Sequence, residues 1–206
     1  MPAHNSLRIG ILGGLFDPPH IYHLISAQWI LQEFDLKKIV FVPAYNPPHK
    51  SKYSSYIHRL RMIKMATRGN KDFLVSEVER YVKGKTYTVE VIKRLKSQQK
   101  FLFPLKISDL KAVEFYLIIG ADQWNEITHW KDPARLFKEC RIIVMPRPGF
   151  RIKRIKPFYK YILISNTPLM NISSTMIRNR IKEGLSIDYL VTPAVGRYII
   201  RQNLYR

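Results

Sequence analysis

The sequence has very little cysteine and no long apolar run. Cys140 is the only cysteine in 206 residues, which excludes an intramolecular disulfide and a zinc site built on several cysteines. No apolar stretch approaches the roughly 18 residues that a membrane-spanning helix requires. Residues 1–6 have neither the cationic start nor the apolar core of a secretory signal. We therefore expect a cytoplasmic protein that has no membrane partner.

Acidic residues are also scarce. Asp and Glu number 15 against 35 Lys and Arg, so the formal net charge is +20. A field of this sign attracts polyanions, and both nucleic acid and a phosphate-rich small substrate fit it. The basic residues are spread along the whole chain, so many of them can simply be solvated surface. Hydrophobic residues make up 46% of the chain, which excludes a disordered or fibrous protein.

Strand-like and helix-like segments alternate along the chain, which is typical of an α/β fold. The continuous apolar run at residues 115–119 indicates a central parallel strand that is covered on both faces. We expect a doubly wound, Rossmann-like parallel sheet with helices on both faces and a ligand at the carboxyl ends of its strands. One domain is expected over residues 1–206, with a helical C-terminal portion from about residue 168. The predicted strands are residues 7–12, 39–42, 73–78, 115–119, 142–145 and 161–165, and the predicted helices are residues 21–34, 57–66, 86–97, 173–182 and 195–201.

The turn after the first predicted strand is the densest candidate site. It lacks the third glycine of a G-x-G-x-x-G fingerprint and the Gly-Lys-Ser/Thr of a Walker A loop. However, Gly13 and Gly14 let a ligand approach the backbone closely, and the helix that follows directs free N–H groups at an anion. His20 and His23 share one face at this helix start and can donate hydrogen bonds to phosphate oxygens. As metal ligands they lack an evident third partner. The turn reads Gly13-Gly14-Leu15-Phe16-Asp17-Pro18-Pro19-His20-Ile21-Tyr22-His23.

A second cluster of polar residues opens a predicted helix near the C-terminus. It reads Ile172-Ser173-Ser174-Thr175-Met176-Ile177-Arg178. A serine here can be an ordinary N-cap. The same arrangement can also bind phosphate, with Arg178 as a charged fork. Taken alone, this segment does not decide between the two interpretations.

Together the two segments resemble the nucleotidyltransferase superfamily, with its G-G-[ST]-F-D-P-x-H-x-G-H and I-S-S-T-x-I-R motifs. Further features are similar to one member family, the bacterial nicotinate-nucleotide adenylyltransferases. The resemblance extends from about residue 8 to residue 206. Its other segments are Pro43 with Asn46-Pro47-Pro48-His49-Lys50, Thr86-Tyr87-Thr88, Ile119-Gly120-Ala121-Asp122, Trp130-Lys131, Pro146-Arg147-Pro148-Gly149 and the closing Tyr198 with Leu204-Tyr205-Arg206.

The resemblance implies transfer of the adenylyl group of ATP to nicotinate mononucleotide, with pyrophosphate as the other product, in NAD biosynthesis. The phosphate of the mononucleotide is already a nucleophile, so catalysis needs only positioning and charge stabilisation. Mg²⁺ bound to the phosphates is the expected cofactor, and no metal site of the protein itself is expected.

The resemblance also assigns roles to individual residues. The catalytic residues are His20, His23 and Arg178. The expected ATP-binding residues are Gly13, Gly14, Phe16, Asp122, Ser174 and Thr175. The expected mononucleotide-binding residues are Asn46, His49, Lys50, Thr88 and Trp130, although a lone tryptophan such as Trp130 is otherwise more often part of a core.

Two positions depart from the motif, and two other functions remain open. Leu15 replaces the usual hydroxyl residue, and Tyr22 replaces a glycine, so the ring either crowds the adenosine pocket or has become part of it. A related enzyme acting on phosphopantetheine or nicotinamide mononucleotide is one alternative, although residues 47–50 and Trp130 argue against phosphopantetheine. The other is a non-catalytic basic relative that binds nucleotides or nucleic acid, for which residues 147–160 are the candidate surface; nucleic acid is the less expected partner.

Overall fold

The fold is built on a six-stranded parallel sheet with the strand order β3-β2-β1-β4-β5-β6. The computed structural model describes residues 7–47, 53–82, 84–98, 102 and 113–206. The order reverses between β1 and β4, and ligands of such sheets bind at the carboxyl ends of the strands beside this point. The expected doubly wound sheet is therefore confirmed. The strands are β1 (Leu7–Gly14), β2 (Lys38–Pro43), β3 (Phe73–Val75), β4 (Val113–Gly120), β5 (Arg141–Met145) and β6 (Ile162–Ile164).

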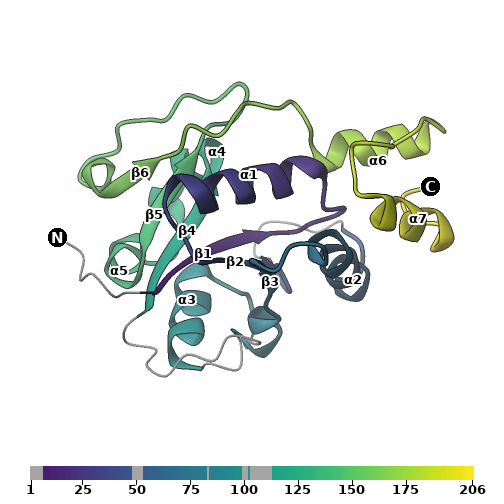
Figure 1. Cartoon of the computed structure of the whole chain (residues 1–206). Coiled ribbons are helices and arrows are strands. Elements are labelled where there is room, and N and C mark those ends of the chain that lie inside the picture. The colour runs from purple at the N-terminus through teal and green to yellow at the C-terminus, as the bar shows by residue number, and fades with distance from the viewer. Residues whose placement is uncertain (1–6, 48–52, 83, 99–101, 103–112) are drawn as a thin grey trace.

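Helices cover both faces of the sheet. Figure 1 shows α1 across one face and α3 and α5 against the other. Alternate side chains of β4 enter different cores, as the pleat of a strand requires: Phe115 and Leu117 pack on the α3 side, and Tyr116 and Ile118 on the α1 side. The helices are α1 (Ile21–Glu33), α2 (Tyr56–Thr67), α3 (Thr88–Ser97), α4 (Ala121–Asn125), α5 (Pro133–Glu139), α6 (Ser174–Lys182) and α7 (Pro193–Arg201).

Some predicted boundaries are wrong. The strand predicted at residues 73–78 ends at Val75, because the chain turns there into the 3₁₀-helix η1 (Val78–Tyr81). The Ser76 hydroxyl accepts a hydrogen bond from the backbone N–H of Val78 in this turn. The short helices α4 and α5 have no predicted counterpart, since five and seven residues are too few for a clear periodicity.

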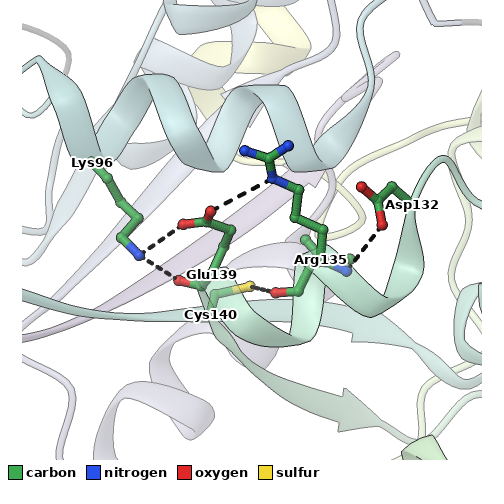
Figure 2. Close-up of polar contacts among 6 residues, drawn as sticks. Lys96, Asp132, Arg135, Glu139 and Cys140 are labelled. Carbon is green, nitrogen blue, oxygen red and sulfur yellow. Dashed lines mark hydrogen bonds and ion pairs between the residues drawn. The ribbon is translucent and has the colours of Figure 1, made fainter.

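Polar contacts cap α5 and join it to Lys96 of α3 (Figure 2). Asp132 adopts a left-handed φ of 49° and accepts a hydrogen bond from the backbone N–H of Arg135, which caps the helix. At the other end, Glu139 accepts a hydrogen bond of 2.9 Å from Lys96 of α3. Cys140 follows, and its buried Sγ donates to the carbonyl of Leu136.

The C-terminal helices form a separate layer beside α2. A third buried cluster joins Met62 of α2 to Ile177 of α6 and to Val195, Tyr198 and Ile199 of α7. Figure 1 places α6 and α7 near the carboxyl end of β1, at the opposite side of the molecule from the N-terminus. None of the helices in the described part of the chain is long and apolar enough to cross a membrane.

Candidate active site at the carboxyl ends of the strands

A cleft of about 1240 Å³ opens at the carboxyl ends of the central strands. Its walls come from the ends of β1 and β4, the start of α3, α4 and the segment after β5. The predicted site residues that line it are Gly13, Gly14, Asp122, Thr88 and Trp130. The cleft therefore brings together predicted ATP-binding and predicted mononucleotide-binding positions.

The turn at residues 14–20 has an unusual backbone at its centre. Phe16 adopts a left-handed φ of 53°, which a bulky residue rarely does and which is typical of functional sites. Its ring is only 2% exposed and lies edge-on against His23, with 5.1 Å between the ring centres. The side chain of Phe16 thus packs against the ring of His23 and supports it. A Cβ on Gly13 would meet no atom within 4 Å, so a ligand can lie directly against this backbone.

His20 and His23 form a closely packed pair at the start of α1. His20 is the N-cap residue, and its backbone N–H donates to Nδ1 of His23 over 3.1 Å. The ring centres are 3.7 Å apart. Because Nδ1 of His23 accepts a hydrogen bond, the neutral ring must carry its proton on Nε2. His23 can therefore donate a hydrogen bond from Nε2.

Both histidines are neutral at physiological pH in the free protein. Burial, aided by the nearby charge of Arg147, lowers the pKa of His20 from 6.5 to about 4. The pKa of His23 is held well below its usual value, first by burial and then by the charges of His20 and Arg147. A pair of neutral N–H donors is suited to an incoming anion, because no buried positive charge has to be maintained before the anion arrives.

Helix α6 docks on the same turn. The Ser173 hydroxyl accepts from the backbone N–H of Met176, so Ser173 is the N-cap, while Ser174 donates to the carbonyl of Pro18 over 2.8 Å. Arg178 donates from Nη1 to the carbonyl of Asp17 over 2.7 Å and from Nη2 to the Thr175 hydroxyl over 3.1 Å. These contacts place the guanidinium beside the turn. The residues that gather here, outside the lining of the cleft, are His20, His23, Ser174, Thr175 and Arg178.

Arg147 lies between the residues that line the cleft and the histidines at the turn. It was not predicted as a site residue. Its Nε lies 3.7 Å from Oδ1 of Asp122, and this buried carboxylate oxygen has no hydrogen-bond partner among the described residues. A Cβ at Gly120 would collide with this carboxylate, so a larger residue at position 120 would force the Asp122 side chain to move. The signal available in the sequence was the Pro146-Arg147-Pro148-Gly149 segment, which gave no indication that Arg147 approaches the histidines.

The start of α3 and Trp130 form another part of the wall of the cleft. Tyr87 is the N-cap of α3 and Thr88 its first residue. Lys131, also in the lining, places its Nζ 4.4 Å from the centre of the Tyr87 ring and 2.6 Å from Oε1 of Glu90. Lys131 was not predicted either, although it adjoins Trp130 in the sequence.

The loop after β2 is fastened to the segment before α3. Asn46 donates from Nδ2 to the carbonyl of Gly84 over 3.3 Å, and its own carbonyl accepts from Thr86. Glu79, a lining residue that no sequence pattern indicated, accepts from the Thr86 hydroxyl over 2.7 Å and from the backbone N–H of Tyr45 over 2.8 Å. Burial raises the pKa of Glu79. The predicted His49 and Lys50 lie outside the described residues.

Comparison with known proteins agrees with this geometry. The profile of the "Cytidylyltransferase-like" family matches residues 11–180. A protein of Thermoanaerobacter sp. (strain X514) named "Probable nicotinate-nucleotide adenylyltransferase" is 40% identical, over 97% of this chain and 95% of its own. A protein of the same name from Bacillus licheniformis is 34% identical, over 96% and 98%. The solved Plasmodium falciparum nicotinic acid mononucleotide adenylyltransferase, complexed with NaAD, shares the fold, with a TM-score of 0.72 at 23% identity over 96% and 97% of the two chains. The chain belongs to the nicotinate-nucleotide adenylyltransferase family of cytidylyltransferase-like proteins.

Proposed function

We propose that the protein transfers the adenylyl group of ATP to nicotinate mononucleotide, forming nicotinate adenine dinucleotide and pyrophosphate in NAD biosynthesis. One observation carries the proposal. The neutral donors His20 and His23 and the guanidinium of Arg178 surround one turn, and the adjoining cleft leads from Gly13 to the start of α3. Relatives that are 34–40% identical over nearly the whole chain carry the name of this activity.

The phosphates of ATP bind at the turn in this proposal. Nε2–H of His23 donates to a phosphate oxygen, and Arg178 and Arg147 supply positive charge from α6 and from the segment after β5. The main chain of Gly13 and Gly14 lies against the nucleotide. These groups are fixed before the substrate arrives, so little reorganisation accompanies the reaction, which is where such sites gain most of their rate.

The chemical step is a displacement at the α-phosphorus. A phosphate oxygen of the mononucleotide forms a bond to this phosphorus, the bond to the bridging oxygen of the β-phosphate breaks, and pyrophosphate leaves with that electron pair. The attacking oxygen carries no proton at neutral pH, so the chain needs no general base. Its residues align the two substrates and stabilise the charge that accumulates on the α-phosphate.

The pyridine ring binds at the other end of the cleft. Thr88 begins the ten-residue helix α3, whose N-terminal N–H groups favour a carboxylate, and Trp130 offers a ring face for stacking. Asn46, and also His49 and Lys50 beyond the described residues, belong to the proposed mononucleotide loop. Phe16 and Asp122 complete the ATP side, Phe16 by supporting His23.

Mg²⁺ is part of the proposal as an ion that ATP brings with it. The described residues contain no cluster of three His, Cys, Asp or Glu side chains that could hold a metal alone. Asp122, whose carboxylate faces Arg147, is the acidic residue of the cleft on the proposed ATP side, and this fits an ion that is bound mainly by phosphates and water. Such an ion supplies charge neutralisation of the phosphates.

The proposal treats residues 1–206 as one nucleotidyltransferase domain, because Ser174 and Arg178 of its C-terminal portion, from about residue 168, contact the turn before α1. The enzyme is proposed to work in the cytoplasm, in keeping with its single cysteine, Cys140.

Pyrophosphate release from ATP, measured with nicotinate mononucleotide and with nicotinamide mononucleotide in turn, tests the proposal. We expect a higher kcat/KM with the acid form. The substitution His23→Ala should lower kcat by about 10²–10³, as the loss of one preorganised donor does. The proposal would be rejected if no pyrophosphate were released with either mononucleotide, or if phosphopantetheine gave the higher kcat/KM. A higher kcat/KM with nicotinamide mononucleotide would reject the substrate assignment alone.

A further inference from the structure

Asp17 is a buried carboxylate at which three distant segments meet. Its side chain lies in the turn before α1 and the residue is only 2% exposed. Oδ2 accepts a hydrogen bond from the backbone N–H of Ser54 over 3.0 Å, and Oδ1 accepts from the Tyr205 hydroxyl over 2.6 Å. Its carbonyl accepts from Arg178. Asp17 therefore joins the loop after β2, helix α6 and the segment after α7.

Arg59 of α2 completes the arrangement from the other side. It is fully buried, and it donates from Nε to the carbonyl of Ser54 over 2.9 Å. Its Nη1 donates to the carbonyls of Leu15 and Ala44, over 3.1 Å and 2.6 Å. Ser54 is thus held on its N–H by Asp17 and on its carbonyl by Arg59. The two charged side chains fix the spacing between the turn at residues 14–20 and the two residues Ser54 and Ala44.

This spacing has a direct consequence for catalysis. The turn carries the proposed phosphate-binding groups, and the proposed mononucleotide-binding Asn46 lies two residues after Ala44, which Arg59 ties to Ser54. A displacement of one relative to the other changes the distance between the two reacting phosphates, and a misplacement of about 1 Å can lower a rate about 10²-fold.

We propose that Tyr205 is a positioning residue of the adenylyl transfer, acting through Asp17 on the turn and on Ser54, which Arg59 joins to Ala44. The inference rests on the proposed function for its catalytic consequence, whereas its geometric consequence is independent of it. A short hydrogen bond to a carboxylate is among the strong ones, so loss of the hydroxyl leaves Oδ1 buried without that donor. The carboxylate is then fixed by a donor on Oδ2 alone, so its hydrogen bond with the N–H of Ser54 weakens.

A matched pair of variants tests the proposal. Tyr205→Phe removes only the hydroxyl that reaches Asp17. Tyr198→Phe, the control, removes another tyrosine hydroxyl of the C-terminal portion, which lies 2.8 Å from Nδ1 of His58 on α2 and does not contact the turn. We expect kcat to fall about tenfold or more in Tyr205→Phe, with KM for ATP changing little, and kcat of Tyr198→Phe to stay within about twofold of the unmodified protein.

A double variant separates positioning from a general loss of stability. If Tyr205 acts through Asp17, Tyr205→Phe should add almost nothing to the loss of kcat caused by Asp17→Asn. Additive losses, or equal kcat values for Tyr205→Phe and Tyr198→Phe, would overturn the proposal.

Amide hydrogen exchange supplies a measurement that does not depend on activity. Exchange at the amide of Ser54 should become faster in Tyr205→Phe and remain unchanged in Tyr198→Phe. If the unmodified protein releases no pyrophosphate, the proposed function fails, and this exchange measurement still decides on the geometry. Unchanged exchange at Ser54 in Tyr205→Phe would show that the hydroxyl does not position this segment.

Discussion

The neutral state of His20 and His23 sets the pH dependence of the protein at the scale of single residues. Burial favours the uncharged imidazole, so the pKa of His20 is about 4 in the folded chain and 6.5 in the unfolded chain. Below pH 6.5 the unfolded state therefore binds protons that the folded state does not. The free energy of unfolding consequently falls as the pH decreases from 6.5 to about 4.

This loss should amount to about 3 kcal/mol at most for His20. Urea denaturation at several pH values, with the substitution His20→Asn as control, measures it. We expect the variant to show a smaller loss of stability between pH 6.5 and 4. Identical slopes in the two proteins would mean that burial does not lower the pKa of His20 in the folded chain.

Tyr22 occupies the space between α1 and the end of β5. The residue is 5% exposed, and its hydroxyl lies 3.5 Å from the carbonyl of Pro146. We expect Tyr22→Gly to lower the free energy of unfolding by about 3–5 kcal/mol, because it leaves a cavity and adds the helix penalty of glycine. The folded variant should also bind ATP more weakly, since the ring packs beside the segment after β5 that carries Arg147.

Isothermal titration of ATP, at a temperature where the variant is folded, measures this effect. Tyr22→Phe serves as the control and should retain the affinity for ATP, as the 3.5 Å hydrogen bond is weak. Tighter ATP binding by a folded Tyr22→Gly protein would show that the ring obstructs the nucleotide.

Sequence reasoning identified some residues of the proposed site and not others for a physical reason. The neighbours Gly13 and Gly14, followed by His20 and His23, form one local turn, so their spacing alone indicates an anion site. Arg147 is brought to the histidines by the pairing of β5 with β4. No local pattern expresses that approach, and the same holds for Glu79 and Arg59.

At the scale of secondary structure, α5 depends on one capping residue. Asp132 combines a left-handed φ with a hydrogen bond to the backbone N–H of Arg135 (Figure 2). Asp132→Ala removes the cap and places alanine in a conformation that it tolerates poorly. We expect the free energy of unfolding to fall by about 1–2 kcal/mol.

Denaturation in urea checks this value. Asp132→Asn is the control, because asparagine accepts the left-handed conformation and can keep the cap. A variant Asp132→Ala as stable as the unmodified protein would mean that α5 is fixed by its contacts with α3 alone.

The elements that the sequence predicts best are those with long patterns. The strands β4 and β5 are recognisable because burial on both faces leaves a continuous apolar run, and α3 is recognisable because burial on one face leaves a helical periodicity. The strand predicted to residue 78 was too long because the turn at Ser76 depends on a side-chain hydrogen bond. The helix starts at Thr88 and Ser174 agreed within two residues with prediction.

At the scale of the whole molecule, the net charge of +20 should act on the rate of substrate capture. ATP is a polyanion, so a positive field raises the rate of encounter, and salt screens that field. We expect kcat/KM for ATP to fall about tenfold between low salt and about 0.5 M salt, while kcat changes little.

A potassium chloride series followed by pyrophosphate release measures this dependence, with added sucrose as a control for viscosity. The same series applied to single-stranded DNA, by filter binding, should give only weak and strongly salt-dependent retention. Tight DNA binding at physiological salt, unaffected by ATP, would instead favour the nucleic-acid alternative and residues 147–160 as its surface.

The reactivity of Cys140 can report local opening of the structure between α5 and β5. The thiol is buried where α5 meets β5, and burial raises its pKa to about 12, so almost no thiolate exists while the fold is closed. An alkylating or aromatic disulfide reagent therefore modifies the chain only when this part of the sheet separates. The rate of labelling thus measures how often this region opens locally. Added nucleotide should slow the labelling in proportion to the fraction of protein that has nucleotide bound.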